Sequence, residues 1–217
     1  MATWIAHIRI AEYFIKNYRN LDNIEFLVGN IGPDCGVPNE DWSQFTPDTR
    51  ISHWRSEEKI DDAIDVESFK KSYLMTKDDK YPFYLGYYLH LQTDIEWNKF
   101  FNKKKQEPIY ADGLRSDPDF IWEIKKDWYG QDRVYLQEHK DSIFFTKFAK
   151  IKEFPNKYLD FYPDNAFIRQ VKYITNYYMQ GIKEEDPNRE FPFLSKDEMN
   201  DFVNDTILVL NGLYNVF

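Results

Sequence analysis

The chain has 217 residues, enough for one domain with a substantial hydrophobic core, and we treat residues 1–217 as a single domain. Its 37 acidic and 28 basic residues give a formal net charge of −9. This charge disfavours a nucleic-acid-binding surface, because contacts to phosphates need a basic face. The single cysteine, Cys35, excludes an internal disulfide and a thiolate-rich zinc site.

The sequence also bears on the cellular location. No apolar segment reaches the ~20 residues that a membrane-spanning helix needs, and residues 1–7 lack the pattern of a secretory signal. The acidic charge and the lack of a basic amphipathic helix argue against stable binding to an anionic membrane. We therefore expect a cytoplasmic protein, and the oligomeric state stays open.

Apolar residues at helical spacing predict a first helix over residues 3–18, with Thr3 as its N-cap. A short helix is expected over residues 22–29. Glycine and proline then predict a loop over residues 30–36. Residues 37–58 have a loop-like composition and are longer than an ordinary connection, which is typical of functional or disordered loops.

Two further helices are predicted before residue 106. One covers residues 65–76 and is capped by Asp65. The other covers residues 81–105 and is the strongest helical pattern in the chain, with aromatic and aliphatic residues on most of its sides. We therefore expect this helix to be buried on most sides near its middle.

The second half is predicted to be helical as well. After a break over residues 108–118, a helical pattern continues to about Phe154, with Gly130 as a point where it can split. Helices follow over residues 164–180 and 195–213, the last opening with a capping-box spacing. No alternating strand pattern occurs, so the expected fold is an all-α bundle of seven or eight helices.

The first candidate for chemistry is the pair His90 and Asp94 in the helix predicted over residues 81–105. Residues four apart share a helix face, so the imidazole and the carboxylate can chelate one cation. A buried carboxylate costs free energy unless it is paired or bound to a metal. The spacing alone leaves a simple His–Asp hydrogen bond in the core open as the alternative.

Three more residues extend this pair. His7 lies on the buried side of the first helix, Asp34 in the glycine- and proline-bounded loop, and His53 in the long loop. Each has an ordinary explanation by itself, as a core histidine, a turn carboxylate and a surface residue. With His90 and Asp94 they make three imidazoles and two carboxylates, the donors that a divalent hydrolytic site uses.

The segments around these residues resemble the zinc-dependent phospholipase C family, which shares its all-helical fold with fungal single-strand nucleases. The resemblance covers residues 1–105, and residues 106–217 contain no motif that we recognise. The segments that carry it are Trp4–His7, Phe26–Asp34, Ser52–Trp54 and Phe83–Asp94.

The resemblance implies hydrolysis of a phosphoester by a metal-bound water. It implies that Asp34 lies near the attacking water as a catalytic residue. Two features depart from the family: three residues precede Trp4, so that Trp4 has no amine to serve as a ligand, and the expected ligands of a third ion are not evident after Asp94. We therefore expect one or two divalent ions, zinc first, with iron or manganese as alternatives. The implied metal ligands are His7, Asp34, His53, His90 and Asp94.

The expected substrate is a small phosphoester rather than a phospholipid surface. Trp54, Arg55 and Tyr87 are the predicted substrate-binding residues, and Lys59 is a further candidate for a phosphate contact. Cys35 follows Asp34 directly and is interpreted as a packing residue rather than a nucleophile.

Two alternatives remain open. The chain can be a non-catalytic helical protein with a structural metal, as the missing third-ion ligands suggest. It can also be an HD-like phosphohydrolase, although no His–Asp dipeptide occurs in it. His139, the remaining histidine, lies in a polar stretch that is typical of a solvent-exposed helix face.

Overall fold

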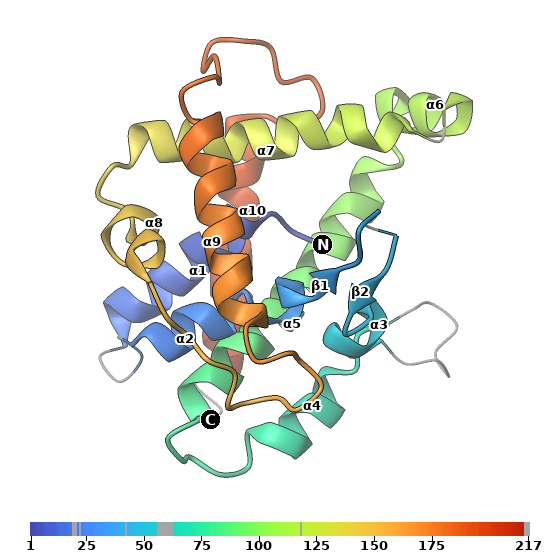
Figure 1. The fold of residues 1–217 in the computed structure, drawn as a ribbon. Helices are drawn as coiled ribbons and strands as arrows, with labels where there is room; N and C mark the ends of the chain where they lie inside the picture. The colour runs from blue at the N-terminus through green and yellow to red at the C-terminus, as the bar shows by residue number, and fades with distance from the viewer. Residues whose placement is uncertain (19–20, 22, 42, 56–62, 118, 215–217) are drawn as a thin grey trace.

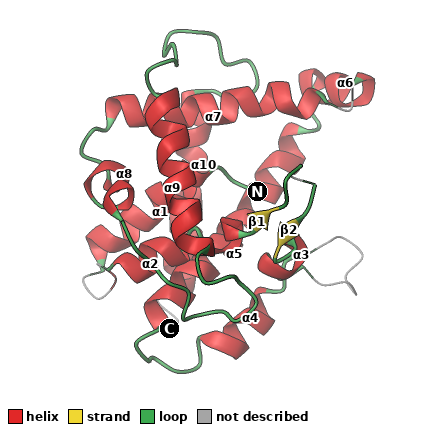
Figure 2. Cartoon of the chain, in the orientation of Figure 1, coloured by secondary structure: helices red, strands yellow, loops and turns green. Residues whose placement is uncertain are grey.

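The computed structural model describes the chain except for residues 19–20, 22, 42, 56–62, 118 and 215–217, and its described part is mostly helical (Figure 1; Figure 2). The predicted all-α class is confirmed. The described elements are α1 (Trp4–Asn17), α2 (Ile24–Gly29), η2 (Gly32–Cys35), β1 (Val37–Pro38), β2 (Phe45–Thr46), α3 (Thr49–Ser52), α4 (Val66–Tyr73), α5 (Tyr81–Lys104), α6 (Pro108–Ser116), α7 (Phe120–Glu138), α8 (Ile143–Thr146), η3 (Phe148–Lys150), α9 (Ala166–Gly181) and α10 (Lys196–Tyr214).

Helix α5 is the element around which the others pack. It contacts α1, α2, α4, α10 and η2, and its residues from Phe83 to Asp94 are all buried. Figure 1 shows α7 lying across the top of the molecule and α9 running downward from near α7. The expectation that this helix is buried on most sides near its middle is confirmed, and it exposes polar residues such as Lys99 and Lys103 only toward its C-terminal end.

Two glycines let α2 and α5 touch backbone to backbone. A Cβ added to Gly29 would lie 2.1 Å from the carbonyl oxygen of Phe83, and one added to Gly86 would lie 2.2 Å from that of Phe26. No larger residue fits at either position without moving a helix. The close crossing carries the backbone carbonyl of Asn30 to the side of α5 that holds His90.

The predicted helix caps are present. Thr3 accepts a hydrogen bond from the Ala6 amide at the start of α1, and Asp65 accepts one from the Ser68 amide at the start of α4. Ser195 and Glu198 form a reciprocal capping box, in which each side chain accepts from the other residue's amide, at 3.2 and 2.8 Å. The predicted start of α2 at residue 22 lies outside the described residues.

The predicted break over residues 108–118 was wrong for most of its length. Residues Pro108–Ser116 form α6, with Pro108 in the first turn, where a missing amide hydrogen costs nothing. Helix α7 also continues through Gly130 without a split. That glycine makes room for a neighbour instead, since a Cβ there would lie 2.3 Å from the guanidinium of Arg189.

The long loop after η2 contains structure that its composition does not predict. Strands β1 and β2 pair in antiparallel register, and Figure 2 shows them as two short arrows beside α3. Asp48 caps α3, and His53 follows directly as its C-cap residue. The loop is therefore a folded arm that carries His53 to the core. None of the described helices is both long and apolar enough to cross a membrane.

We predict that Gly86→Ala lowers the free energy of unfolding by about 2 kcal/mol or more, because the new methyl group forces α2 away from α5. Urea denaturation measures this change. Gly212→Ala is the matched control, since a Cβ at Gly212 meets open space and should stabilise α10 by about 0.5–1 kcal/mol. Equal effects of the two substitutions would contradict the proposed helix contact.

Candidate metal centre

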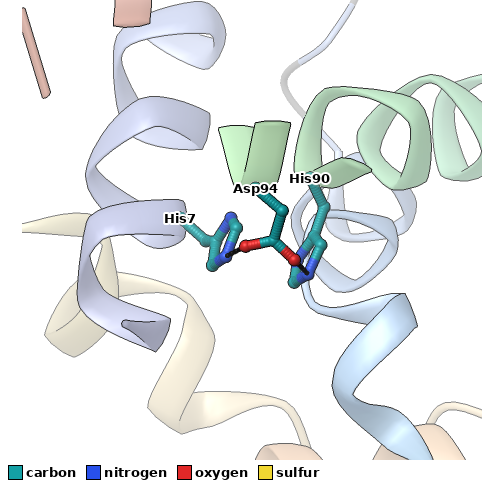
Figure 3. Close-up of side chains that lie close together, drawn as sticks. All are labelled: His7, His90 and Asp94. Atoms are coloured by element: carbon teal, nitrogen blue, oxygen red, sulfur yellow. Dashed lines mark ion pairs between the residues drawn. The ribbon is translucent and has the colours of Figure 1, made fainter. Parts of the chain in front are cut away.

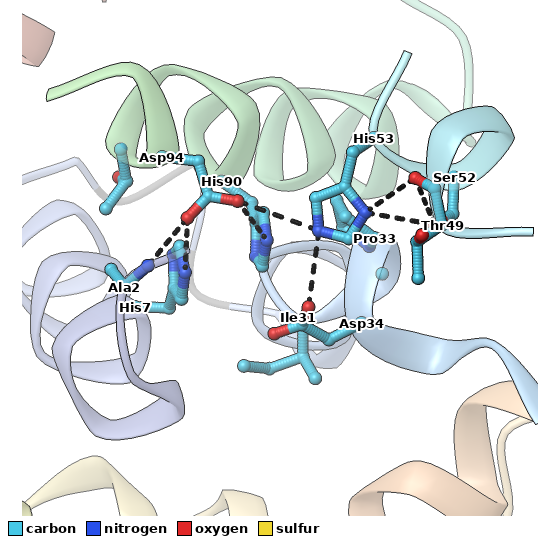
Figure 4. Close-up of polar contacts among 12 residues, drawn as sticks. Ala2, His7, Ile31, Pro33, Asp34, Thr49, Ser52, His53, His90 and Asp94 are labelled. Atoms are coloured by element: carbon cyan, nitrogen blue, oxygen red, sulfur yellow. Dashed lines mark hydrogen bonds and ion pairs between the residues drawn. The ribbon is translucent and has the colours of Figure 1, made fainter. Parts of the chain in front are cut away.

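The five residues singled out in the sequence come together at one place. His7 comes from α1, Asp34 from η2, His53 from the end of α3, and His90 and Asp94 from α5. Figure 4 shows the three imidazoles and the two carboxylates facing a common centre. Two groups of three have ligand atoms within 4.8 Å of one another: His7, His90 and Asp94, and Asp34, His53 and His90.

Asp94 lies at the middle of the cluster. Its Oδ1 is 3.5 Å from Nε2 of His7, and its Oδ2 is 3.5 Å from Nε2 of His90 (Figure 3). The same Oδ2 is 3.6 Å from Nε2 of His53. The rings of His7 and His90 stack at 3.7 Å, 3° from parallel. The backbone amide of Ala2 donates to Oδ1 at 2.8 Å. The two oxygens thus point to two different sets of nitrogens, as a bridging carboxylate does.

The second group opens toward solvent. Oδ1 of Asp34 lies 3.3 Å from Nε2 of His53, and the Asp34 side chain is 9% exposed, whereas those of His53 and Asp94 are 1% exposed. Asp34 is held on the short helix η2 by the bond from its amide to the carbonyl of Ile31. Of the five residues, Asp34 is therefore the most exposed, and it lines the cavity described below.

Backbone carbonyls fix the tautomers of two histidines. Nδ1 of His90 lies 2.9 Å from the carbonyl oxygen of Asn30, and Nδ1 of His53 lies 3.1 Å from that of Thr49. A carbonyl only accepts, so each Nδ1 carries the hydrogen and each Nε2 of a neutral ring presents a lone pair. Metal-binding histidines are oriented in this way.

No hydrogen-bond donor among the described residues reaches these lone pairs. Nε2 of His53 and His90, both ring nitrogens of His7, and Oδ2 of Asp94 are buried without a hydrogen-bond partner among the described residues. When His53 and His90 are neutral, their Nε2 lone pairs face carboxylate oxygens at 3.3–3.6 Å and repel them, because both atoms carry lone pairs. A cation at the centre, either a proton or a metal ion, removes this repulsion, and the donor set fits a divalent metal.

The pKa values of the clustered residues show that a single proton does not balance the charges of the two carboxylates. Burial, followed by the charge of His90, lowers the pKa of His7 to about 4. Burial also disfavours charge on His90, but the carboxylates of Asp94 and Asp34 outweigh it and raise the pKa of His90. Burial raises the pKa of Asp94, yet His90 and the contact from His7 overcome it and hold that pKa well below its usual range. A positive charge on His90 would offset only one of the two negative charges of Asp94 and Asp34.

A cavity of about 370 Å³ adjoins the cluster at Asp34 and His53. Residues Ala2–Trp4 line one part of it, and α7 and α9 supply another part with Lys125, Tyr129, Arg169 and Tyr173. The second half of the chain, in which the sequence shows no motif, therefore contributes to this cavity. The sequence offers only one weak signal, a lysine in the apolar row Ile121, Lys125, Tyr129 of α7.

The predicted substrate-binding residues lie elsewhere than this cavity. Trp54 packs edge-on against Phe69 at 5.4 Å, and Trp54 and Arg55 line a separate, shallower hollow beside α4. Tyr87 is fully buried, stacks on Phe69 and donates its hydroxyl to the carbonyl of Ser52. Lys59 is outside the described residues.

The other two candidates of the sequence have ordinary environments. His139 is exposed at the end of α7, where its ring stacks on Tyr135 at 4.1 Å. Cys35 is buried, its thiol donates to the carbonyl of Ile31 at 3.2 Å, and burial raises its pKa well above the usual value. A thiol held in this protonated state is a packing group rather than a nucleophile.

Comparisons of the chain with models of protein families, with curated proteins and with solved structures found no match. The function must therefore be argued from the geometry of the cluster and its cavity.

We predict that the chain stripped of metal loses about 2–3 kcal/mol of stability through His7 between pH 7 and pH 4.5. The unfolded His7 takes up a proton near pH 6.5, while the folded one stays neutral until about pH 4, so stability falls as pH falls through this window. Urea denaturation at both pH values, for the wild type and His7→Gln, isolates this contribution.

His139→Gln serves as the matched control, because it removes an exposed histidine. A His7→Gln variant with the same fall in stability as the wild type would show that His7 is not a buried neutral group.

Proposed function

We propose that the protein is a metal-dependent hydrolase of a small phosphoester, with a fold of the zinc-dependent phospholipase C type. One observation carries the proposal: unpartnered nitrogens of His7, His53 and His90 converge with two carboxylates at the edge of a cavity. The order of these residues along residues 1–105 supports the same family.

The ligands divide between two positions. His53, His90, Asp34 and Oδ2 of Asp94 surround one, and His7 with Oδ1 of Asp94 borders the other. Each Nε2 has a single lone pair and serves one ion, whereas the two oxygens of Asp94 can serve two. We propose one ion at the first position and a second, weaker one beside His7. Three nitrogens and two carboxylates favour zinc, with manganese or iron as alternatives.

A divalent ion held here would supply a water of lowered pKa and would neutralise charge on the phosphoryl oxygens. The chain contributes the remaining steps. Asp34 borders the cavity, accepts a proton from the attacking water and aligns it toward phosphorus. The carbonyls of Asn30 and Thr49 keep the imidazoles in the tautomer that leaves Nε2 unprotonated. Asp94, fully buried, holds its charge where bulk water does not screen it.

We propose a small-molecule substrate, because a cavity of about 370 Å³ has the size of a small-ligand site. The cytoplasm is the proposed location, in keeping with a single buried thiol.

A structural metal is the second candidate function. His7, His90 and Asp94 are completely buried, as in sites that serve only to stabilise a fold. Exposure of Asp34 to the cavity argues against this alternative, since a structural site is closed on all sides.

We predict that the purified protein contains stoichiometric zinc, manganese or iron and hydrolyses a nitrophenyl phosphoester. Asp34→Asn should lower kcat by about 10²–10⁴-fold, because the proton acceptor is removed, and should weaken metal binding less than the loss of His90, because the amide oxygen can still face the ion. His90→Ala should lose both metal and turnover. Elemental analysis and steady-state kinetics measure these effects.

His139→Ala is the control for the loss of a histidine, and both its metal content and its turnover should equal those of the wild type. A protein that binds metal tightly, melts at a lower temperature without it and hydrolyses no phosphoester would instead be explained by the structural-metal alternative.

A further inference from the structure

Two basic side chains face the cavity from the second half of the chain. Arg169 lies in the first turns of α9, and its Nη2 donates to the carbonyl of Gly36 at 2.7 Å. Gly36 is two residues beyond Asp34, so this contact places the guanidinium at the Asp34 end of the cavity. Nε of Arg169 is buried and has no hydrogen-bond partner in the part of the chain that the structure describes. Lys125 lies on α7, with its ammonium 4.6 Å from the ring centre of Trp122.

Neither cation has a carboxylate partner within the described part of the chain. Burial lowers the pKa of Lys125. Burial also lowers the pKa of Arg169, and the opposing effects of Cys35 and Tyr173 are smaller. Arg9 is half-buried and bonds to the amide oxygen of Asn200 instead of a carboxylate. Two other half-buried arginines are paired: Arg189 lies 2.6 Å from Asp127 and Arg133 lies 3.1 Å from Glu185. Lys104 likewise lies 2.7 Å from Glu198.

This difference is informative in a chain with a net charge of −9. A partly buried cation costs free energy when no anion compensates it. Acidic residues are abundant here, and yet Asp34, a member of the metal cluster, is the one acidic residue among the described residues that line the cavity. The aromatic residues Trp4, Tyr129 and Tyr173 make up much of the rest of its wall. The wall is thus suited to an anion that comes from outside.

We propose that Arg169 and Lys125 form an anion subsite that selects a phosphomonoester as the substrate. The inference rests on the proposed function for the identity of the catalytic centre. A monoester carries a charge of about −1.5 to −2 at pH 7, whereas a diester carries only one negative charge. Two uncompensated cations match the monoester.

The two cations have different roles in this subsite. The planar guanidinium of Arg169 presents the N–H groups that the Gly36 contact leaves free to phosphate oxygens. Lys125 adds a second positive charge that favours the dianion over the monoanion. The aromatic residues Trp4, Tyr129 and Tyr173 would contact the apolar part of the ester.

Isothermal titration with inorganic phosphate and with dimethyl phosphate tests the subsite on the metal-loaded protein. Phosphate is the dianionic probe and dimethyl phosphate the monoanionic one. The wild type should bind phosphate more tightly, and Arg169→Gln and Lys125→Gln should each weaken phosphate binding by about tenfold or more. Both should reduce the preference for phosphate over dimethyl phosphate.

Matched controls remove the same charge elsewhere. Lys126→Gln and Arg115→Gln change exposed residues that pair with Glu123 and Asp112, and both should bind phosphate within about twofold of the wild type. Arg169→Lys retains the charge without the planar guanidinium and should lie between Arg169→Gln and the wild type. It also provides a second variant at this position in case Arg169→Gln disturbs the cavity by losing the contact to Gly36.

Either of two results would overturn the subsite: equal phosphate affinity in Lys125→Gln and the wild type, or no preference for phosphate over dimethyl phosphate. The outcome is separable from that of the proposed function. Phosphate binding that depends on Lys125 and Arg169 in a protein without turnover would retain the subsite and reject the hydrolase. Turnover with phosphate binding unchanged in both variants would do the reverse.

Discussion

A carboxylate in a dry core is the constraint on which the rest of the site depends. Asp94 is completely buried on the central helix, and a buried charge of this kind is tolerated only beside compensating groups. The chain surrounds it with three imidazoles and one backbone amide. Two of the imidazoles have their Nδ1 hydrogen committed to backbone carbonyls, so neutral rings offer Asp94 lone pairs instead of protons. A metal ion at the centre of the cluster would bind both the imidazole lone pairs and the carboxylate.

The fold meets this constraint through contacts that look purely structural. The close crossing of α2 and α5 at Gly29 and Gly86 brings the Asn30 carbonyl to His90. The folded arm of β1, β2 and α3 carries His53 over α5. The aromatic core gives the cluster its dry surroundings, which strengthen every charge interaction within it. Stability and site geometry are therefore coupled, and damage to the helix crossing should also disturb His90.

The sequence predicted those parts of the structure that follow local rules. Helical spacing located α1, α5 and the caps at Thr3 and Asp65, because periodicity and capping are properties of neighbouring residues. It also selected the five residues that the structure brings together, on the strength of donor chemistry and a family resemblance. The failure at α6 has a local cause as well, since Pro108 both breaks and begins helices.

The sequence could not predict the partners that only the fold brings together. Lys125 and Arg169 are ordinary basic residues in helices, and nothing in their neighbourhoods along the chain connects them to Asp34. Tyr87 is the opposite case. It is an aromatic residue three positions from His90 and was predicted to contact substrate, whereas its side chain packs into the core on Phe69.

Anomalous diffraction from crystals grown with zinc tests the central claim most directly. We expect a strong zinc peak between His53, His90, Asp34 and Asp94, with Nε2–metal distances of ~2.0–2.1 Å. At least one coordination position of this ion should face the cavity. A second, weaker peak beside His7 is expected. A cluster that shows no peak at saturating zinc would contradict the account, and so would a peak confined to surface carboxylates.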